Sequence, residues 1–141
     1  MTPQEVKEYL IGYRYAVRQA SAAQDHLTEL RAMAEQITPN YTSCGSGNAQ
    51  TSDKLGKAVA LIVEAEAKLD AEIELLIATE REIKRVIEAV EEPYKTLLYE
   101  RYINGKTWEQ IAVNMNYSYR QTTRMHGAAL LAVKHVLECP T

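Results

Sequence analysis

The sequence of 141 residues lacks long apolar runs. No stretch approaches the ~18–20 apolar residues that a membrane-spanning helix needs. The first residues, MTPQEVKEYLIGYRY, also lack the basic start and the apolar segment of a secretory signal peptide. We therefore expect a cytoplasmic protein with no membrane partner.

Cysteine is scarce as well, with two residues in the chain. Cys44 lies in a stretch rich in glycine and serine, Cys139 lies near the C-terminus, and neither has a second thiol or a histidine at metal-ligand spacing. His26, His126 and His135 are isolated, and the sequence has no glycine-rich phosphate loop or nucleophile arrangement. We therefore predict no metal, no cofactor and no enzymatic activity, and we expect His126 at the surface or facing a phosphate.

The charge is mildly acidic overall, at −3, but it is unevenly distributed. Residues 1–90 carry ten Lys and Arg against fourteen Asp and Glu, whereas residues 103–137 carry four basic side chains against Glu109 alone. Distant charges are screened beyond about 10 Å, so a locally basic end can still attract a polyanion. Binding by one copy should nevertheless be weak.

The spacing of apolar residues predicts two long helices. The first covers residues 3–37, with apolar side chains at steps close to three and four. Residues 38–52, TPNYTSCGSGNAQTS, gather helix breakers and predict a flexible connection. Asp53 then suits the N-cap of the second helix. At ~1.5 Å per residue each helix would extend for ~50 Å, and together they form an antiparallel hairpin.

Alternating steps of four and three give the second helix a seam typical of coiled coils. The seam residues are Leu55, Val59, Ile62, Leu69, Ile73, Leu76, Ile83, Ile87 and Val90. Glu66 and Glu80 occupy two further seam positions, where each should cost stability unless it meets a basic residue or lies near an end of the seam. Such a seam serves packing within the hairpin and self-association equally well. We expect residues 1–91 to be the hairpin and to form a homo-oligomer.

Pro93 ends the seam and suits the first turn of a new helix, so we place a domain boundary between residues 91 and 92. A short helix is expected over residues 93–103. The pair Asn104-Gly105 then suits a left-handed C-terminal cap.

Two further helix starts follow within NGKTWEQIAVNMNYSYRQTTR, residues 104–124. Thr107 stands three residues before Gln110, and Ser118 stands three before Gln121, so each pair has the form of a capping box. The first helix can run only from Trp108 to about Asn114, because MNY must reverse the chain before Ser118. The spacing predicts a helix–turn–helix.

The two helices have distinct inner and outer faces. The residues expected to point inward are Ile111, Ala112, Tyr117, Thr122, Met125, Ala129, Val133 and Leu137. The residues expected on the outer face, at the start of the last helix, are Tyr119, Arg120, Gln121, Thr123 and Arg124. Such side chains reach base edges and phosphates in a major groove. Compact helix pairs with polar faces also occur in proteins that never bind nucleic acid.

Residues 97–137, LLYERYINGKTWEQIAVNMNYSYRQTTRMHGAALLAVKHVL, resemble the helix–turn–helix in the fourth conserved region of bacterial sigma factors. The match lies in the arginine-aromatic pair before the glycine, the IA of the first helix, the capping serine and the alanine-rich last helix. The whole chain is similar to small regulators of Gram-positive phages and prophages related to the RinA and ArpU late-gene activators.

The resemblance implies positions for the contacts with DNA. Those implied near phosphates are Thr107, Trp108 and Ser118, and those implied to face the groove are Arg120, Gln121, Thr123 and Arg124. The sequence departs from the pattern at Thr122, where such domains usually bury valine, and at Gly127, which weakens the last helix by up to ~1 kcal/mol.

We therefore predict that residues 92–141 form a sigma-region-4-like DNA-binding domain, and that the protein is a sequence-specific transcription regulator of phage or prophage genes. The predicted DNA-binding residues are Lys106, Thr107, Trp108, Ser118, Tyr119, Arg120, Gln121, Thr123 and Arg124. The predicted partner is double-stranded DNA, and RNA polymerase is a further candidate partner. In that alternative the protein is a non-enzymatic helical adaptor that docks on the polymerase or another protein. Salt-dependent retention on DNA separates the two.

Overall fold

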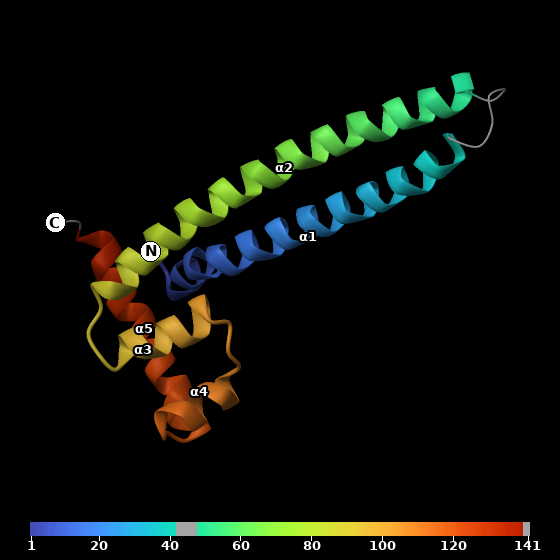
Figure 1. Cartoon of the computed structure of the whole chain (residues 1–141). Coiled ribbons are helices and arrows are strands. Elements are labelled where there is room, and N and C mark those ends of the chain that lie inside the picture. The colour runs from blue at the N-terminus through green and yellow to red at the C-terminus, as the bar shows by residue number, and fades with distance from the viewer. Residues whose placement is uncertain (42–47, 140–141) are drawn as a thin grey trace. The chain divides into compact units, whose positions relative to one another are not determined.

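The computed structural model describes residues 1–41 and 48–139, and in these residues all regular structure is helical. The elements are α1 (Pro3–Tyr41), α2 (Asn48–Glu88), α3 (Tyr94–Leu98), the π-helical turn η1 (Tyr99–Ile103), α4 (Trp108–Met115) and α5 (Tyr119–Glu138) (Figure 1). The predicted all-α fold, with a long N-terminal helix pair followed by short helices, is confirmed. None of these helices combines the length and the apolar character that a membrane crossing requires.

The packing divides the chain into two compact units. Unit 1 contains Met1–Val17 together with the chain from Leu76 onward, and unit 2 contains Arg18–Leu75. The predicted boundary between residues 91 and 92 does not coincide with this division, since apolar side chains near the ends of both long helices join the core of the short helices.

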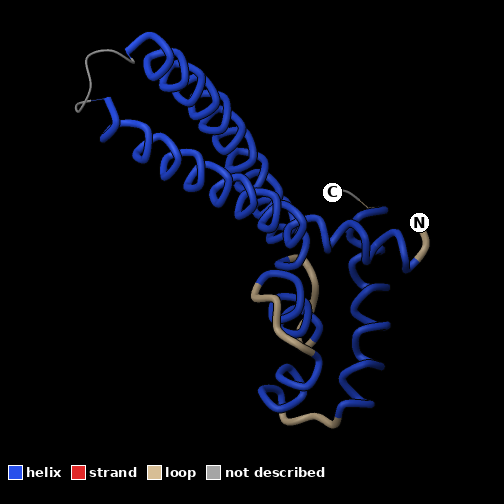
Figure 2. The backbone as a smooth tube through the Cα atoms, turned by 90° about the vertical axis from the view of Figure 1, so that its right-hand side faces the viewer, coloured by secondary structure: helices blue, strands red, loops and turns tan. Residues whose placement is uncertain are grey.

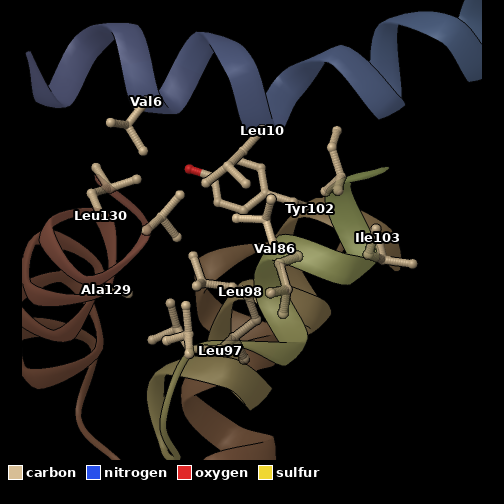
Figure 3. Packing of buried hydrophobic residues seen from close by; sticks show 14 residues of the cluster. Val6, Leu10, Val86, Leu97, Leu98, Tyr102, Ile103, Ala129 and Leu130 are labelled. Atoms are coloured by element: carbon tan, nitrogen blue, oxygen red, sulfur yellow. The ribbon is translucent and has the colours of Figure 1, made fainter. Parts of the chain in front are cut away.

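Unit 1 has one hydrophobic core to which α1, α2, α3, η1, α4 and α5 all contribute, and Figure 3 shows part of it. Its fully buried large side chains are Val6 and Leu10 from α1, Ile83 and Ile87 from α2, Leu97 and Leu98 from α3, Ile111 from α4 and Val133 from α5. Tyr102 and Ile103 of η1 are buried in the same cluster. A buried aliphatic side chain contributes roughly 1.5–3 kcal/mol. The short helices therefore depend on this shared core.

One polar contact joins α1 to α2 within unit 1, and other polar contacts support each helix separately. The Tyr9 hydroxyl donates to Glu82 Oε1 at 3.0 Å, and burial together with this carboxylate raises the pKa of Tyr9 to about 12. Glu80, predicted to need a basic partner, pairs with Lys84 one turn later. α1 itself begins with a capping box, since Thr2 and Glu5 exchange side-chain and backbone hydrogen bonds.

Unit 2 holds the remainder of α1 and α2, which lie side by side (Figure 2). Its buried cluster is small and consists of Leu27, Leu30 and Ala65, with Ile62 and Leu69 partly buried against it. Glu66, the other glutamate predicted to need a basic partner, meets Arg31 at 3.1 Å. The predicted seam is only partly covered here, because Val59 and Ile73 are 49% and 39% exposed.

The predicted connection between the long helices is corrected by the structure. Both helices extend into residues 38–52, and α2 begins at Asn48, so the assignment of Asp53 as its N-cap was wrong. Asp53 instead pairs with Lys57 at 3.4 Å along the helix surface. Residues such as Ser, Thr and Asp disfavour a helix by only a few tenths of a kcal/mol, so a long helix can continue through them. Residues 42–47 lie outside the described residues.

The predicted helix over residues 93–103 begins at Tyr94 and changes from α to π geometry at Tyr99. The predicted left-handed cap forms at Gly105, which has a φ of +69°, whereas Asn104 stays right-handed. A Cβ atom on Gly105 would lie 2.7 Å from the guanidinium carbon of Arg14. The positive φ therefore favours glycine here, whereas the end of the flexible Arg14 side chain could move aside for a Cβ atom.

Gly105, which precedes α4, and Gly127, which lies within α5, should respond oppositely to alanine. Gly105→Ala should lower the free energy of unfolding by about 1–2 kcal/mol, because an L-residue disfavours positive φ. Gly127→Ala should raise it by about 0.5–1 kcal/mol, because Gly127 lies within α5 and a Cβ there meets no described atom within 4 Å. Urea denaturation of both variants measures the difference. Equal effects of the same sign would contradict this account of the two positions.

Candidate nucleic-acid interface

The predicted helix–turn–helix is present in the structure. α4 ends at Met115, one residue later than predicted, and Asn116 follows in the left-handed conformation at φ +59°. The Tyr117 amide donates back to the Ala112 carbonyl at 3.0 Å, which closes the turn. α5 starts directly afterwards, with Ser118 as its N-cap. A left-handed asparagine is a usual way to end a helix abruptly.

Both predicted caps form, but only one is a complete box. The Thr107 hydroxyl accepts from the Gln110 amide at 3.2 Å, and the Gln110 side chain accepts from the Thr107 amide at 3.0 Å. Ser118 accepts from the Gln121 amide at 3.1 Å, which is the hydroxyl half of the predicted box. Thr107 and Ser118 are exposed, so the starts of α4 and α5 lie at the surface, and helix starts favour anions.

The inner face follows the prediction closely. The buried members are Ile111, Ala112, Thr122, Ala129 and Val133, and the partly buried members are Tyr117, Met125 and Leu137. Thr122 is fully buried where the resembled domains carry valine. Its hydroxyl donates to the Ser118 carbonyl at 2.9 Å, so the polar group is satisfied within the helix.

The outer face of α5 is exposed over its first two turns. Its exposed residues are Tyr119, Arg120, Gln121, Thr123 and Arg124. Among the described residues, neither Arg120 nor Arg124 forms a salt bridge, and the two stand four residues apart on one side of the helix. The Thr123 hydroxyl is turned back and donates to the Arg120 carbonyl at 2.9 Å. The two guanidinium groups are therefore available to an external anion.

Lys106 is engaged within the protein. Its ammonium lies 2.7 Å from Glu100 Oε2, and the same carboxylate oxygen accepts from the Asn114 amide group at 3.3 Å. The hydrogen bond from Lys106 is the main reason why the pKa of Glu100 is lowered, despite opposing desolvation. Of the predicted binding residues, Lys106 thus has its charge largely compensated, whereas the arginines of α5 do not.

Trp108 lies in a cluster that the sequence did not predict. The guanidinium of Arg101 lies 4.6 Å from the centre of the indole ring, and its Nη1 donates to the Lys106 carbonyl at 3.0 Å. The His126 ring centre is also 4.5 Å from the Trp108 ring centre. Arg101 thereby joins η1 to the first residue of α4, and Trp108 joins α4 to α5.

The expectation that His126 lies at the surface or faces a phosphate was wrong. His126 is half-buried, and its Nε2 shares a hydrogen bond of 2.6 Å with the Tyr102 hydroxyl. Burial, reinforced by the positive charges of Lys7 and Arg101, lowers the pKa of His126 to about 4. Burial also raises the pKa of Tyr102 to about 12. The histidine is therefore a neutral packing residue at physiological pH.

Among the described residues, the surroundings of the helix–turn–helix offer a shallow hollow but no metal-binding cluster. A shallow hollow of about 360 Å³ on α4 is lined by Lys106, Glu109, Gln110, Val113 and Asn114. In the part of the chain that the structure describes, no group of three His, Cys, Asp or Glu side chains could hold a metal ion. The free Cys139 is exposed, and Cys44 lies outside the described residues.

Comparison of the chain with protein-family models, with curated proteins and with solved structures finds no match. The assignment of a function therefore depends on the geometry of α4 and α5 and on the resemblance given above.

Removal of either cap should destabilise the protein. Thr107→Ala and Ser118→Ala should each lower the free energy of unfolding by about 0.5–2 kcal/mol, because a backbone amide at a helix start loses its acceptor. In Thr107→Ala the backbone amide of residue 107 keeps its bond to the Gln110 side chain, so we expect no larger loss there than in Ser118→Ala, which removes the side-chain cap bond of α5. Thermal unfolding of the two variants checks this. Unchanged midpoints in both would mean that the caps do not support these helices.

His126 should make stability depend on pH. Its pKa is about 4 in the folded protein, below the ordinary 6.5, so the unfolded chain binds more protons between these values. Stability should therefore fall as the pH is lowered from about 6.5 towards 4. The test is the thermal midpoint between pH 7 and 5, where carboxylates contribute little. His126→Gln should flatten the profile, and His135→Gln, at an exposed position of α5, should retain it; retention in both variants would contradict the assignment.

Proposed function

We propose that this protein is a sequence-specific DNA-binding transcription regulator, and that α5 is its recognition helix. The observation that carries the proposal is the pair Arg120 and Arg124, exposed on one side of the first turns of α5 and unpaired among the described residues. Arginine forms paired hydrogen bonds with guanine edges and with phosphates. Gln121, which follows Arg120 in the sequence, can form a similar pair of hydrogen bonds with adenine. Tyr119, 52% exposed, extends the same surface.

The caps support the proposal because they present backbone amides at two neighbouring helix starts. Thr107 and Ser118 each fix one amide, and the first amides of α4 and α5 have no carbonyl one turn earlier in their helices. Phosphate oxygens are acceptors of the kind that such sites bind. In this proposal Thr107, Trp108 and Ser118 lie along the phosphate backbone, and Trp108 acts chiefly by holding α4 in place.

The resemblance of residues 97–137 to the fourth region of sigma factors supports the same orientation. It also underlies the proposal that the genes controlled belong to a phage or prophage. The proposed role requires no catalytic step and no cofactor.

One copy should bind DNA weakly, because residues 103–137 carry only four basic side chains. Lys106 is already paired with Glu100, which leaves few charges for phosphates. We therefore propose that residues of the helical hairpin self-associate and place two recognition helices on one duplex. Once one helix is bound, the second contact is effectively intramolecular.

A second candidate is the helical adaptor that docks on RNA polymerase or another protein. It is favoured by Val113, which is 75% exposed at the hollow on α4. The adaptor needs no salt-dependent DNA binding, whereas the regulator does. Retention on a DNA column as the salt is raised from about 50 to about 200 mM, the range over which phosphate contacts weaken, separates the candidates.

Loss of an arginine on α5 should weaken binding to a selected DNA site. Arg120→Ala or Arg124→Ala should each cost about 1–3 kcal/mol of binding free energy, as one two-pronged base contact is lost. Both side chains are exposed, so the thermal midpoint should barely change. Arg81→Ala, at an exposed position of α2, is the control. Wild-type affinity in both α5 variants would show that this face does not read DNA.

A further inference from the structure

Three positive side chains of unit 1 lie near the start of α4 without an acidic partner. They are Lys7 and Arg14 of α1 and Arg101 of η1, and all three are partly buried. Among the described residues none of the three forms a salt bridge. Cations that lose part of their hydration usually have a carboxylate beside them. The unpaired group therefore fits an anion from outside the protein.

Other partly buried lysines of unit 1 show the usual pairing. Three of them meet a carboxylate: Lys84 meets Glu80, Lys95 meets Glu88 and Lys106 meets Glu100. Lys7 and Lys134 have no such partner in the part of the chain that the structure describes. Glu5 and Glu8, the acidic residues closest to Lys7 in the sequence, accept other hydrogen bonds instead. The charge of Lys7 is therefore not compensated within its own helix.

Helical spacing places Lys7 and Arg14 on the same side of α1. They stand three residues before and four residues after Leu10, which is fully buried beside Tyr102 in the core of unit 1 (Figure 3). Burial and the charge of Lys7 both lower the pKa of His126, which agrees with an ammonium close to that ring. The side of α1 that packs on η1 and α5 thus carries both cations.

Arg14 reaches the loop that leads into α4. Its Nη1 donates to the Ile103 carbonyl at 3.4 Å, and its guanidinium lies against Gly105, two residues before the N-cap of α4. The carbonyl is neutral, so this hydrogen bond leaves the charge of Arg14 uncompensated. Arg101 lies over the ring of Trp108, the first residue of α4. The positive charges therefore adjoin the residues that the proposed function sets along the phosphates.

We propose that Lys7 and Arg14 contact the phosphate backbone of the DNA that α5 reads. The proposal rests on the proposed function and extends its DNA-binding surface from the helix–turn–helix to the first turns of α1. Seven residues of helix separate the two side chains by roughly 10 Å, so a row of phosphates fits them better than one small anion. Such contacts position a protein on DNA and carry no sequence information. They raise the affinity of each copy, and they are independent of self-association.

The test measures binding of the full chain to two probes, the duplex recovered by selection and a duplex of the same composition in scrambled order. Lys7→Gln should weaken both complexes by the same factor, about threefold to tenfold at moderate salt. It should also lower the slope of log affinity against log salt concentration by about one. Arg120→Ala, in contrast, should weaken mainly the selected duplex, because a base contact is lost. Circular dichroism shows that each variant is folded.

Arg14 also supports the loop before α4, so two variants separate its charge from that support. Arg14→Gln removes the charge, whereas Arg14→Lys keeps it. If the charge meets a phosphate, Arg14→Gln should lower the salt slope by about one and Arg14→Lys should retain it. Equal salt slopes in the two folded variants would rule out the phosphate contact of Arg14.

Lys134→Gln is the matched control for Lys7→Gln. Lys134 is also partly buried and belongs to none of the proposed DNA contacts. It lies eight residues beyond His126, about 12 Å further along α5 from the DNA-binding turns. This variant should leave both affinities and the salt slope unchanged. An unchanged slope in Lys7→Gln, or equal losses in both lysine variants, would overturn the proposal and leave the role of α5 intact. A wild type that binds neither duplex would overturn both.

Discussion

Three successive residues of η1 hold the helix–turn–helix together. Glu100 binds Lys106 before α4 and Asn114 near its end, Arg101 lies over Trp108, and Tyr102 bonds His126 on α5. The exposed surface of α5 depends on these contacts, because they connect both helices to one short turn. The wider turn of a π-helix directs consecutive side chains to different neighbours, and such turns often occur where function needs them.

This arrangement separates the residues that support α4 and α5 from those that can meet a ligand. Lys106, Trp108 and His126 are held by partners within unit 1. Arg120 and Arg124 lie outside that network and keep their charges exposed. Preorganised helices lower the entropy lost on binding, and the proposed function depends on this because the face of α5 offers two arginines without a salt bridge among the described residues. Affinity, in contrast, needs more charge than one copy supplies, and this is the reason for proposing self-association.

Local chemistry made the helix starts predictable from sequence. Thr107 and Ser118 act through amides three residues away, so their spacing was sufficient, and Gly105 was recognisable as a left-handed cap. The residues on the inner face of α5 could be predicted from the helical spacing of its apolar residues. Asp53 shows the limit of such signals, since a residue suited to a cap lies inside α2 when the helix starts earlier.

The contacts of Arg101, Trp108 and His126 could not be predicted in the same way. The ring and side-chain contacts join residues 7 to 24 positions apart whose types fit a surface equally well, and no periodic pattern relates them. The division into two units was hidden for a similar reason. Val6 and Ile87 belong to helices whose apolar spacing continues without a break, so nothing local shows which core each residue joins.

The central claim is that α5 reads a DNA sequence, and selection of bound DNA from a random pool tests it most directly. The full protein, selected at moderate salt, should enrich a defined sequence, and two copies of it should recur at a fixed spacing if the protein binds as a dimer. Recovered DNA with no shared sequence after repeated rounds, or no DNA retained above background, would contradict the claim.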